Sequence, residues 1–394
     1  MTKITTPIEY AKAACDTIMQ KFSAEELPIV GKFHYHQGVF LSGMEMTYLE
    51  CGEEKYNQYI KRWVDSIINS DGVITNYDSE TLDDLQPGIL LYRLSETTND
   101  ARYEKAIQAI KKDFDVYEKN KYGGFSHKKG RCTGQMWLDG FYMGSPFLAM
   151  YGKKYNDMSC FDVIYTQMRL MWEHCRDEKT GLLYHAWDSL KTAAWADRES
   201  GCAPCFWGRA MGWYVVALCN ILDYAPADWE HRAEFISNIR ECAAALAKYA
   251  DERTGCWYQV LDRTDDPENW IELSCSSLFT YFLSMAICRG YIDEKLYAPV
   301  VKKAYSGILG FIKTNPDGTV DVPRVCIGTG VGDYRFYLDR PTVTNDLHGA
   351  GAFVLCCNAY NEFQKHENAC IGGKTDETQF KDVDCSYVDC GCCV

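Results

Sequence analysis

The chain has 394 residues, of which 47% are hydrophobic and 14% aromatic, and its formal net charge at neutral pH is −14. This much apolar material is sufficient for a large core. The acidic balance argues against nucleic acid or an anionic membrane as a partner, because both require a basic face. No window holds roughly 18 uninterrupted apolar residues, and the N-terminus lacks the apolar segment of a signal peptide, so we expect a cytoplasmic protein without a membrane span.

Helical periodicity dominates, and two kinds of helix alternate along the chain. The first kind is amphipathic, with apolar side chains recurring every three or four positions and a charged opposite face. The second kind is apolar or rich in small residues on nearly all sides, which is typical of a buried helix. Helices of the first kind are predicted at residues 7–22, 55–70, 99–118, 157–175, 229–250 and 295–313. Those of the second kind are predicted in residues 38–50, 82–94, 135–150, 206–218, 273–287 and 345–357.

Six outer and six inner helices in strict alternation predict an all-α fold, an (α/α)6 barrel of six helical hairpins closed into a ring. An open solenoid of helix pairs is the alternative, but solenoids keep a regular repeat length and the inner helices here are unevenly spaced. Short strands are expected only near residues 182–186 and 257–261. We interpret residues 1–366 as one barrel domain and residues 367–394 as a polar, cysteine-rich, flexible tail.

The chain contains 20 cysteines, and most lie in apolar helical stretches, where a free thiol behaves as a small hydrophobe. Cys202 and Cys205 have CxxC spacing, for which a zinc site or a redox pair is the alternative, but no second ligand pair follows at a suitable distance. The same alternative exists for the tail, which we interpret as an extension with free thiols. The tail cysteines are Cys385, Cys390, Cys392 and Cys393.

Residues 123–150 combine a glycine pair, a basic run and an aromatic helix that begins near Gln135 and carries one acid, Asp139. An unpaired carboxylate in a dry site is costly. Asp139 is therefore either a capping or paired structural acid, or a catalytic acid with a raised pKa.

The loops that enter the inner helices share an unusual composition of acids, tryptophans and cations. If the inner helices run parallel, their N-terminal ends meet at one mouth, where aromatic faces stack on sugars and polar groups reach hydroxyls and carboxylates. Such a pocket fits a carbohydrate, and its cations in an acidic protein indicate an anionic sugar. The side chains concerned are Asp83, Asp84, His127 to Arg131, Trp137, Asp139, His185, Trp187, Trp207, Arg209, Trp213, Asp333, Tyr334, Arg335 and Tyr337.

Each of these residues also has a structural interpretation. The tryptophans are equally typical of a core, and His127 and Lys128 of a solvated loop. Asp83 fits a helix N-cap, while His185 and Arg209 fit buried side chains with polar partners. What these interpretations leave unexplained is that all of them occur at the same end of the inner helices.

Seven motifs along the chain resemble, in order, those of glycoside hydrolase family 105, the unsaturated rhamnogalacturonyl hydrolases, which are related to the unsaturated glucuronyl hydrolases of family 88. Cys205 departs from the pattern, because an acidic residue is common there, and the tail has no family counterpart. The motifs are LDDLQPG (82–88), GFSHK (124–128), QMWLDGFYMGSPF (135–147), YHAWD (184–188), FWGRAMGWY (206–214), residues 272–293, and RPTVTNDLHGAGAF (340–353).

The resemblance implies an (α/α)6 barrel and a mechanism with a single acid, unlike the usual two-carboxylate glycosidase. It implies Asp139 as the general acid/base, and Asp83 as a second carboxylate that holds ring hydroxyls and raises the pKa of Asp139. No metal or organic cofactor is implied. The implied substrate-binding residues are His127, Lys128, Trp137, His185, Trp207, Arg209, Trp213 and Tyr334, with Trp207 stacking on the sugar ring and Trp137 and Trp213 as wall or core.

The leading hypothesis is a hydrolase of unsaturated rhamnogalacturonan oligosaccharides. An unsaturated glucuronyl hydrolase with the same chemistry is the closest alternative. A non-catalytic sugar-binding barrel would lack Asp139 or Asp83, and an epimerase would require two facing histidines, which the motifs do not supply. The expected partner is a small unsaturated oligosaccharide, and both a monomer and a homodimer are compatible with the sequence.

Overall fold

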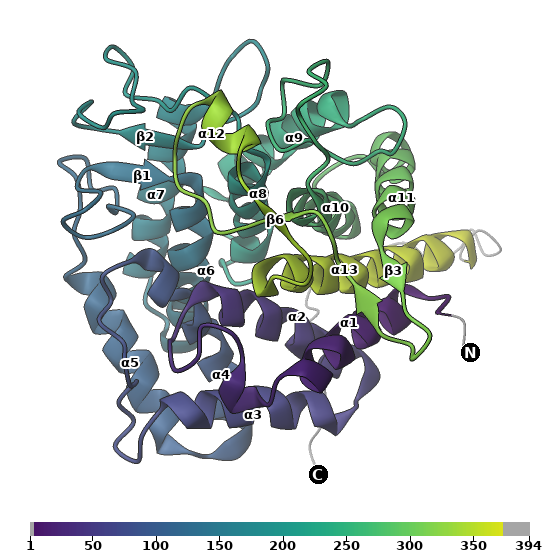
Figure 1. Ribbon diagram of the computed structural model, residues 1–394. Helices are drawn as coiled ribbons and strands as arrows, with labels where there is room; N and C mark the ends of the chain where they lie inside the picture. Colours follow the sequence, from purple (N-terminus) through teal and green to yellow (C-terminus); the bar gives the residue numbers. More distant parts are fainter. Residues whose placement is uncertain (1–3, 373–394) are drawn as a thin grey trace, which may run out of the picture.

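The computed structural model describes residues 4–372 and consists mainly of helices (Figure 1). Both predicted sets of helices occur, in strict alternation. The amphipathic set comprises α1 (Pro7–Lys21), α3 (Glu54–Ile67), α5 (Ala101–Asp115), α7 (Ser159–Cys175), α9 (Arg232–Tyr249) and α11 (Glu294–Phe311). The second set comprises α2 (Tyr35–Cys51), α4 (Leu90–Thr98), α6 (Leu138–Tyr155), α8 (Gly208–Leu222), α10 (Leu273–Cys288) and α13 (Leu347–Gly372).

The second set forms a closed inner ring. Helix α2 packs on the turn that precedes α4, this turn packs on α6, and α6, α8, α10 and α13 follow in order until α13 packs on α2 again. Each amphipathic helix lies outside its inner neighbour, as Figure 1 shows for α5, α3 and α11 around the rim. Ring closure excludes the open solenoid and confirms the (α/α)6 barrel.

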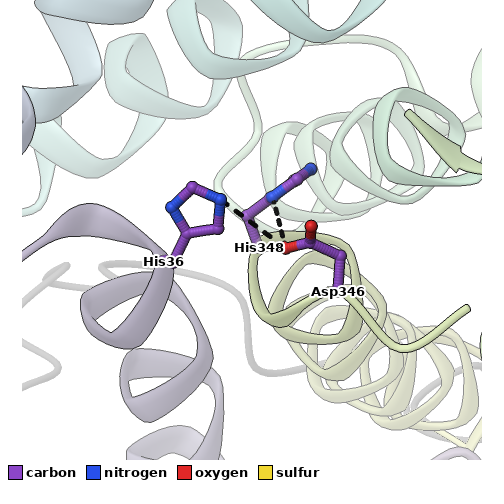
Figure 2. Close-up of side chains that lie close together, drawn as sticks. All are labelled: His36, Asp346 and His348. Atoms are coloured by element: carbon purple, nitrogen blue, oxygen red, sulfur yellow. Dashed lines mark ion pairs between the residues drawn. The ribbon is translucent and has the colours of Figure 1, made fainter. Parts of the chain in front are cut away.

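The ring closes at the seam between α2 and α13, where the two backbones approach closely. A Cβ atom added to Gly351 of α13 would lie 2.7 Å from the backbone nitrogen of Phe40 in α2, so only glycine fits. At the end of this seam, His36 of α2 faces Asp346 and His348 at the start of α13 (Figure 2).

Burial explains the two helix types. In α3 the buried side chains recur at three- and four-residue spacing, for example Tyr59, Trp63 and Ile67. In α10 every residue except the last is buried. Three of its buried hydroxyls, those of Ser276, Thr280 and Ser284, donate hydrogen bonds to carbonyl oxygens four residues earlier.

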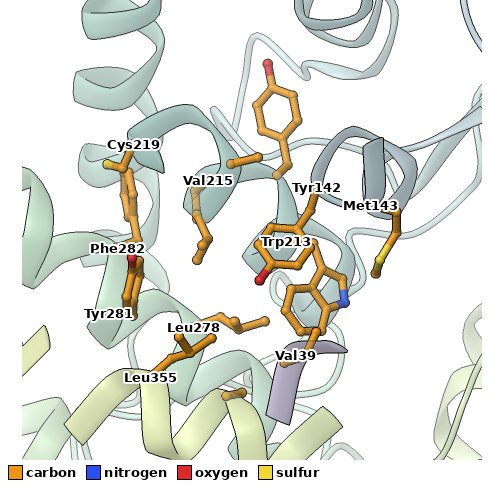
Figure 3. Close-up of a cluster of buried hydrophobic side chains, with 14 of the residues drawn as sticks. Val39, Tyr142, Met143, Trp213, Val215, Cys219, Leu278, Tyr281, Phe282 and Leu355 are labelled. Carbon is orange, nitrogen blue, oxygen red and sulfur yellow. The ribbon is translucent and has the colours of Figure 1, made fainter. Parts of the chain in front are cut away.

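The middle of the barrel is filled by an apolar cluster from five inner helices (Figure 3). Trp213 of α8 lies in it, 1% exposed, with its ring stacked 4.7 Å from that of Tyr142 in α6. Val39 of α2, Leu278 of α10 and Leu355 of α13 lie around the same cluster. Truncating a fully buried tryptophan typically costs about 3–5 kcal/mol, so this layer contributes strongly to stability.

Short elements differ from the expected ones in detail. Residues 135–137 are not the start of a helix but a strand, β1 (Gln135–Trp137), because they pair antiparallel with β2 (Ala186–Asp188). Residues 257–261 form only isolated bridges. The other strand pairs are β3 (Lys313–Thr314) with β4 (Val320–Asp321), and β5 (Val325–Cys326) with β6 (Thr342–Val343). The remaining short helices are η1 (Ala24–Glu26), η2 (Leu82–Asp84), η3 (Gln86–Ile89) and α12 (Tyr334–Leu338).

The predicted helix at 82–94 begins as two 3₁₀ turns before α4. The first is capped by Thr81, whose hydroxyl oxygen accepts a hydrogen bond from the amide of Asp83. Pro87 lies in the second and has no amide hydrogen to donate. Thr81 rather than Asp83 is therefore the N-cap.

Cysteines within residues 4–372 are free thiols, and most are buried, as expected for small hydrophobes. Cys202 donates a hydrogen bond to the carbonyl oxygen of His174, and in the part of the chain that the structure describes neither Cys202 nor Cys205 joins a group of candidate metal ligands. Across the same residues, no helix is long and apolar enough to cross a membrane.

The boundary predicted at residue 366 falls inside a helix, since α13 continues to Gly372. Packing explains the extension, because Glu367 forms a 2.6 Å ion pair with Lys302 of α11. The predicted flexible tail, with its four cysteines, lies otherwise outside the described residues.

Candidate active site

A cavity of about 260 Å³ opens at the N-terminal ends of α2 and α6 and at the turn before α4. This placement agrees with the expectation that these ends meet at one mouth. Five of the predicted site residues line it: Asp83, His127, Lys128, Trp137 and Asp139. The other lining residues are His34, Tyr35, His36, Met143, Gly328, Thr329 and Gly330.

Asp139 is the second residue of α6 and is positioned by the strand pair before it. The amide of Leu138 donates a 3.0 Å hydrogen bond to the carbonyl oxygen of His185, which brings the two chain segments together. The first turn of a helix also favours a negative charge, because its free amide groups point toward the end. The β1–β2 pairing thus brings Asp139 beside His185.

Asp139 ends a buried chain of hydrogen bonds. Its Oδ2 lies 3.0 Å from Nε2 of His185, whose Nδ1 lies 2.7 Å from the hydroxyl oxygen of Tyr337. That hydroxyl oxygen also accepts a hydrogen bond from the amide of Gly332. Burial raises the pKa of Tyr337 well above its usual range, so its hydroxyl donates to Nδ1 of His185, and Nε2–H of His185 donates to Asp139.

The protonation state of Asp139 differs from the expectation of a raised pKa. Burial favours the neutral carboxyl, but the hydrogen bond from His185, with His127 and Arg209 nearby, holds the pKa of Asp139 below its usual value. The pKa of the neighbouring Asp84 is raised to about 7 by burial and by the charge of Asp83. In the free protein Asp139 is therefore ionised at neutral pH.

The second carboxylate of the cavity, Asp83, faces a histidine stacked on a tryptophan. Nε2 of His127 lies 3.7 Å from Oδ1 of Asp83. The rings of His127 and Trp137 stack with their centroids 4.1 Å apart. Burial lowers the pKa of His127. Gly140 permits this packing, because an added Cβ would lie 3.2 Å from Nδ1 of His127 and 2.8 Å from Leu82.

Lys128 is the cation of this cavity. Its Nζ lies 5.9 Å from the centroid of the Trp137 ring, and its backbone bridges to Thr81, next to the turn that carries Asp83. Two carboxylates, one ammonium group and a partly exposed indole face therefore surround one small cavity. This combination suits a sugar ring that carries an anionic group.

Comparisons with known proteins identify the family. The family model described as Glycosyl Hydrolase Family 88 matches residues 10–364. A family 105 glycoside hydrolase from C. acetobutylicum ATCC 824 is 34% identical, with a TM-score of 0.85, over 91% of this chain and 99% of that one. The chain belongs to the glycoside hydrolases of families 88 and 105.

Two further similarities extend the comparison. An unsaturated glucuronyl hydrolase from Bacillus sp. GL1 shares the fold, with a TM-score of 0.67 and 14% identity, over 89% of this chain and 95% of that one. A protein of Formosa agariphila named unsaturated 3S-rhamnoglycuronyl hydrolase is 24% identical over 207 residues, which cover 51% of this chain and 54% of that one.

Three residues that the family resemblance places on the substrate, His185, Trp207 and Arg209, do not line the cavity but lie buried behind its wall, where His185 bonds to Asp139. Trp207 is 1% exposed, covered by the rings of His185 and Tyr337, and its indole N–H donates to Gln259. Arg209 is equally buried and donates to the carbonyl oxygens of Cys326 and Ile327, 2.5 and 2.7 Å away. Arg209 thus supports the loop that carries Gly328 to Gly330.

Two other predicted residues lie away from the cavity. Trp213 belongs to the apolar cluster below it, as the alternative core interpretation has it (Figure 3). The hydroxyl of Tyr334 donates to Asp266 near the surface. Tyr337, three residues further on, is the tyrosine that contacts His185.

Sequence reasoning missed one wall of the cavity. His34, Tyr35 and His36 lie at the first turn of α2, but the expected helix began only at residue 38. The signal available was a run of three ring-bearing polar side chains directly before an inner helix, the position that Trp137 and Trp207 occupy before α6 and α8.

Proposed function

We propose that this family 88/105 hydrolase removes the Δ4,5-unsaturated galacturonyl residue from the non-reducing end of lyase-generated rhamnogalacturonan oligosaccharides. The observation that carries the proposal is the placement of Asp139, Asp83 and Lys128 around one small cavity beside Trp137. Trp137 offers its face to the flat unsaturated ring, Lys128 pairs with the uronate carboxylate, and Asp83 accepts hydrogen bonds from ring hydroxyls.

The reaction is hydration of the C4=C5 double bond rather than direct displacement. Asp139 in its neutral form gives its proton to C4, and positive charge develops on C5 and the ring oxygen. A water molecule adds at C5 and gives a proton back to the Asp139 carboxylate. The resulting hemiketal opens, and the aglycone leaves with a 5-keto-4-deoxyuronate as the second product.

The ionised state of Asp139 in the free protein must change when substrate binds. An anionic sugar brings a further negative charge toward Asp139 and displaces water from the cavity, and both effects raise the pKa of a buried carboxyl. His185 then holds the protonated and ionised forms in the same orientation through its hydrogen bond. Asp139 can thereby act first as acid and then as base.

The substrate is tested with two unsaturated disaccharides, an unsaturated galacturonyl-rhamnose and an unsaturated glucuronyl-amino sugar. The unsaturated residue is the same in both, because its C4 configuration is lost, so the two differ in the sugar and linkage that follow it. Loss of the ultraviolet absorbance of the conjugated double bond is the readout. Faster loss with the galacturonyl substrate supports the proposal. Faster loss with the glucuronyl substrate keeps the chemistry but assigns the second candidate, the activity for which the structural relative from Bacillus sp. GL1 is named. Absorbance that persists with both contradicts the hydration reaction.

Tyr337 acts as a positioning residue in this scheme, and its hydroxyl is separable from that of Tyr334. Tyr337→Phe removes the donor to His185, so we expect kcat to fall about 10-fold with KM little changed, because one neutral hydrogen bond contributes about 0.5–1.5 kcal/mol. Tyr334→Phe removes only the bond to Asp266 and should leave kcat within about 2-fold of wild type. Steady-state kinetics of both variants provide the measurement, and equal losses would contradict the assigned role.

A further inference from the structure

A second group of functional side chains lies next to the cavity, at the seam where the barrel closes. His36, Asp346 and His348 present one nitrogen or oxygen each, all within 4.8 Å of one another. Figure 2 shows the two rings and the carboxylate converging from α2 and from the start of α13. The reaction proposed above uses none of the three.

The tautomer of His348 is fixed by its surroundings. Its Nε2 lies 3.0 Å from the carbonyl oxygen of Cys326, and a carbonyl only accepts, so Nε2 carries a hydrogen. Nδ1 of the neutral ring is then a bare acceptor, fully buried, with no hydrogen-bond partner. It nevertheless lies 2.8 Å from Oδ1 of Asp346, which is also an acceptor. Two acceptors at this distance repel each other unless a cation lies between them.

His36 directs a second nitrogen at the same oxygen. Its Nδ1 lies 3.0 Å from Nδ1 of His34, and its Nε2 lies 3.6 Å from Oδ1 of Asp346. With Nδ1–H of His36 donating to His34, the lone pair on Nε2 points to the carboxylate. Both imidazoles then hold an outer N–H on an acceptor and turn an inner lone pair to a common point, as metal-binding histidines do.

We propose that His36, Asp346 and His348 form a binding site for a divalent metal ion of the zinc class. Two imidazole nitrogens with one carboxylate oxygen suit Zn²⁺ and its neighbours, whereas Mg²⁺ and Ca²⁺ prefer oxygen ligands throughout. Two ligand atoms held at about 2.05 Å by one tetrahedral zinc lie roughly 3.3 Å apart. The observed separations of 2.8 and 3.6 Å bracket that value.

The ion would join the first and the last inner helix directly, at the one seam that no chain connection spans. It would also adjoin the substrate cavity, because His36 lines that cavity. His348 bonds to the carbonyl oxygen of Cys326, and the loop that follows Cys326 reaches Gly328 in the cavity wall. We therefore infer that the metal stabilises the closed ring and fixes this wall. The alternative is a proton on Nδ1 of His348, which would form an ion pair with Asp346.

Zinc titration in the absence of substrate distinguishes the two, so its outcome is independent of the proposed function. Thiolates are zinc ligands, so the protein tested is the full chain with Cys385, Cys390, Cys392 and Cys393 replaced by serine. This protein is freed of metal with a chelator and titrated by calorimetry with ZnCl₂, with MgCl₂ as the hard-cation comparison. His36→Ala and Asp346→Asn remove ligands, and circular dichroism verifies their folding.

A matched control is available near the C-terminal end of α13, far along the helix from the seam group. Glu294, His366 and Cys370 form the other group of possible ligands among residues 4–372, and they are more exposed. His366→Ala disrupts that group and leaves the seam intact.

We expect one equivalent of zinc to bind the parent protein and to raise its melting temperature, and His366→Ala to retain both effects. His36→Ala and Asp346→Asn should weaken this binding by more than about 100-fold, beyond the 10–100-fold that outer partners contribute. Binding that both ligand variants retain, or that only His366→Ala removes, overturns the proposal. If the folded parent protein does not bind zinc, the proposal is also overturned, and the alternative of a proton on Nδ1 of His348 replaces it.

Discussion

Asp139→Asn is expected to lower the rate of double-bond loss by about 10³-fold, within the 10²–10⁴-fold range of a general acid/base. The amide has nearly the same shape as the carboxyl and still accepts the hydrogen bond from His185, so the fold should persist. It cannot give a proton to C4 or take one from water. The measurement is the initial rate on the galacturonyl disaccharide at matched enzyme concentration.

The pH dependence of the wild-type rate provides a second readout of the same group. The reaction requires neutral Asp139, and His185 favours the ionised form, so kcat should fall as the pH rises through the pKa of Asp139 in the substrate complex. The residual rate of Asp139→Asn should not show this fall. If Asp139→Asn keeps more than a tenth of the wild-type rate, Asp139 is not the general acid/base.

Asp266→Asn is the matched control for a carboxyl outside the cavity. Asp266 accepts hydrogen bonds from Tyr334 and from the amide of Glu268 near the surface. We expect this variant to stay within about 2-fold of the wild-type rate, because surface contacts contribute little to a distant site. A large loss here would mean that the assay reports folding rather than chemistry.

The barrel was predictable because the pattern that specifies it is local. An apolar stripe on 55–70 and an all-apolar face on 273–287 each identify a helix type within one segment, and strict alternation of the types leaves few ways to bury both. The strand at 135–137 was not predictable in this way. Its pairing partner lies at 186–188, about 50 residues further on, and its own sequence is compatible with a helix.

The sequence predicted which helix ends form the site, but it did not predict which side chains point into the cavity. Asp139 and Asp83 were predicted from their positions at the start of buried helical segments, and the structure places both in the cavity. Whether Trp207 reaches the cavity depends on the packing of Tyr337 over it, and this contact joins residues 130 positions apart. Residue type alone therefore does not separate the tyrosine at 337 from that at 334.

The protonation of Asp139 shows the same limit in electrostatic terms. An aromatic, apolar helix predicts desolvation, which raises the pKa of a carboxyl. The structure adds a fully buried histidine 3.0 Å away, which outweighs desolvation in the free protein. A neighbour 46 residues away in the sequence thus reverses the expected direction of the Asp139 pKa shift, and no local sequence pattern predicts this contact.

Gly351→Ala is expected to lower the free energy of unfolding by about 2–3 kcal/mol, because the added methyl group would clash with the backbone of α2. The new Cβ would lie 2.7 Å from the backbone nitrogen and Cα of Phe40 and 2.8 Å from the carbonyl carbon of Val39. Backbone atoms cannot rotate away as a side-chain tip can, so α2 and α13 must separate. The measurement is the urea midpoint at unchanged slope.

Gly310→Ala is the matched control, since Gly310 also lies in a helix but its added Cβ would meet nothing within 4 Å. There the substitution should stabilise by up to about 1 kcal/mol, because alanine is the better helix former. Gly351→Ala has the same gain in helix propensity, but the steric clash of its Cβ with α2 should cost more than this gain. The strained seam also carries His36, Asp346 and His348, so this variant should weaken the proposed zinc binding together with stability. Wild-type stability in Gly351→Ala would mean that the ring does not depend on close contact between its first and last inner helices.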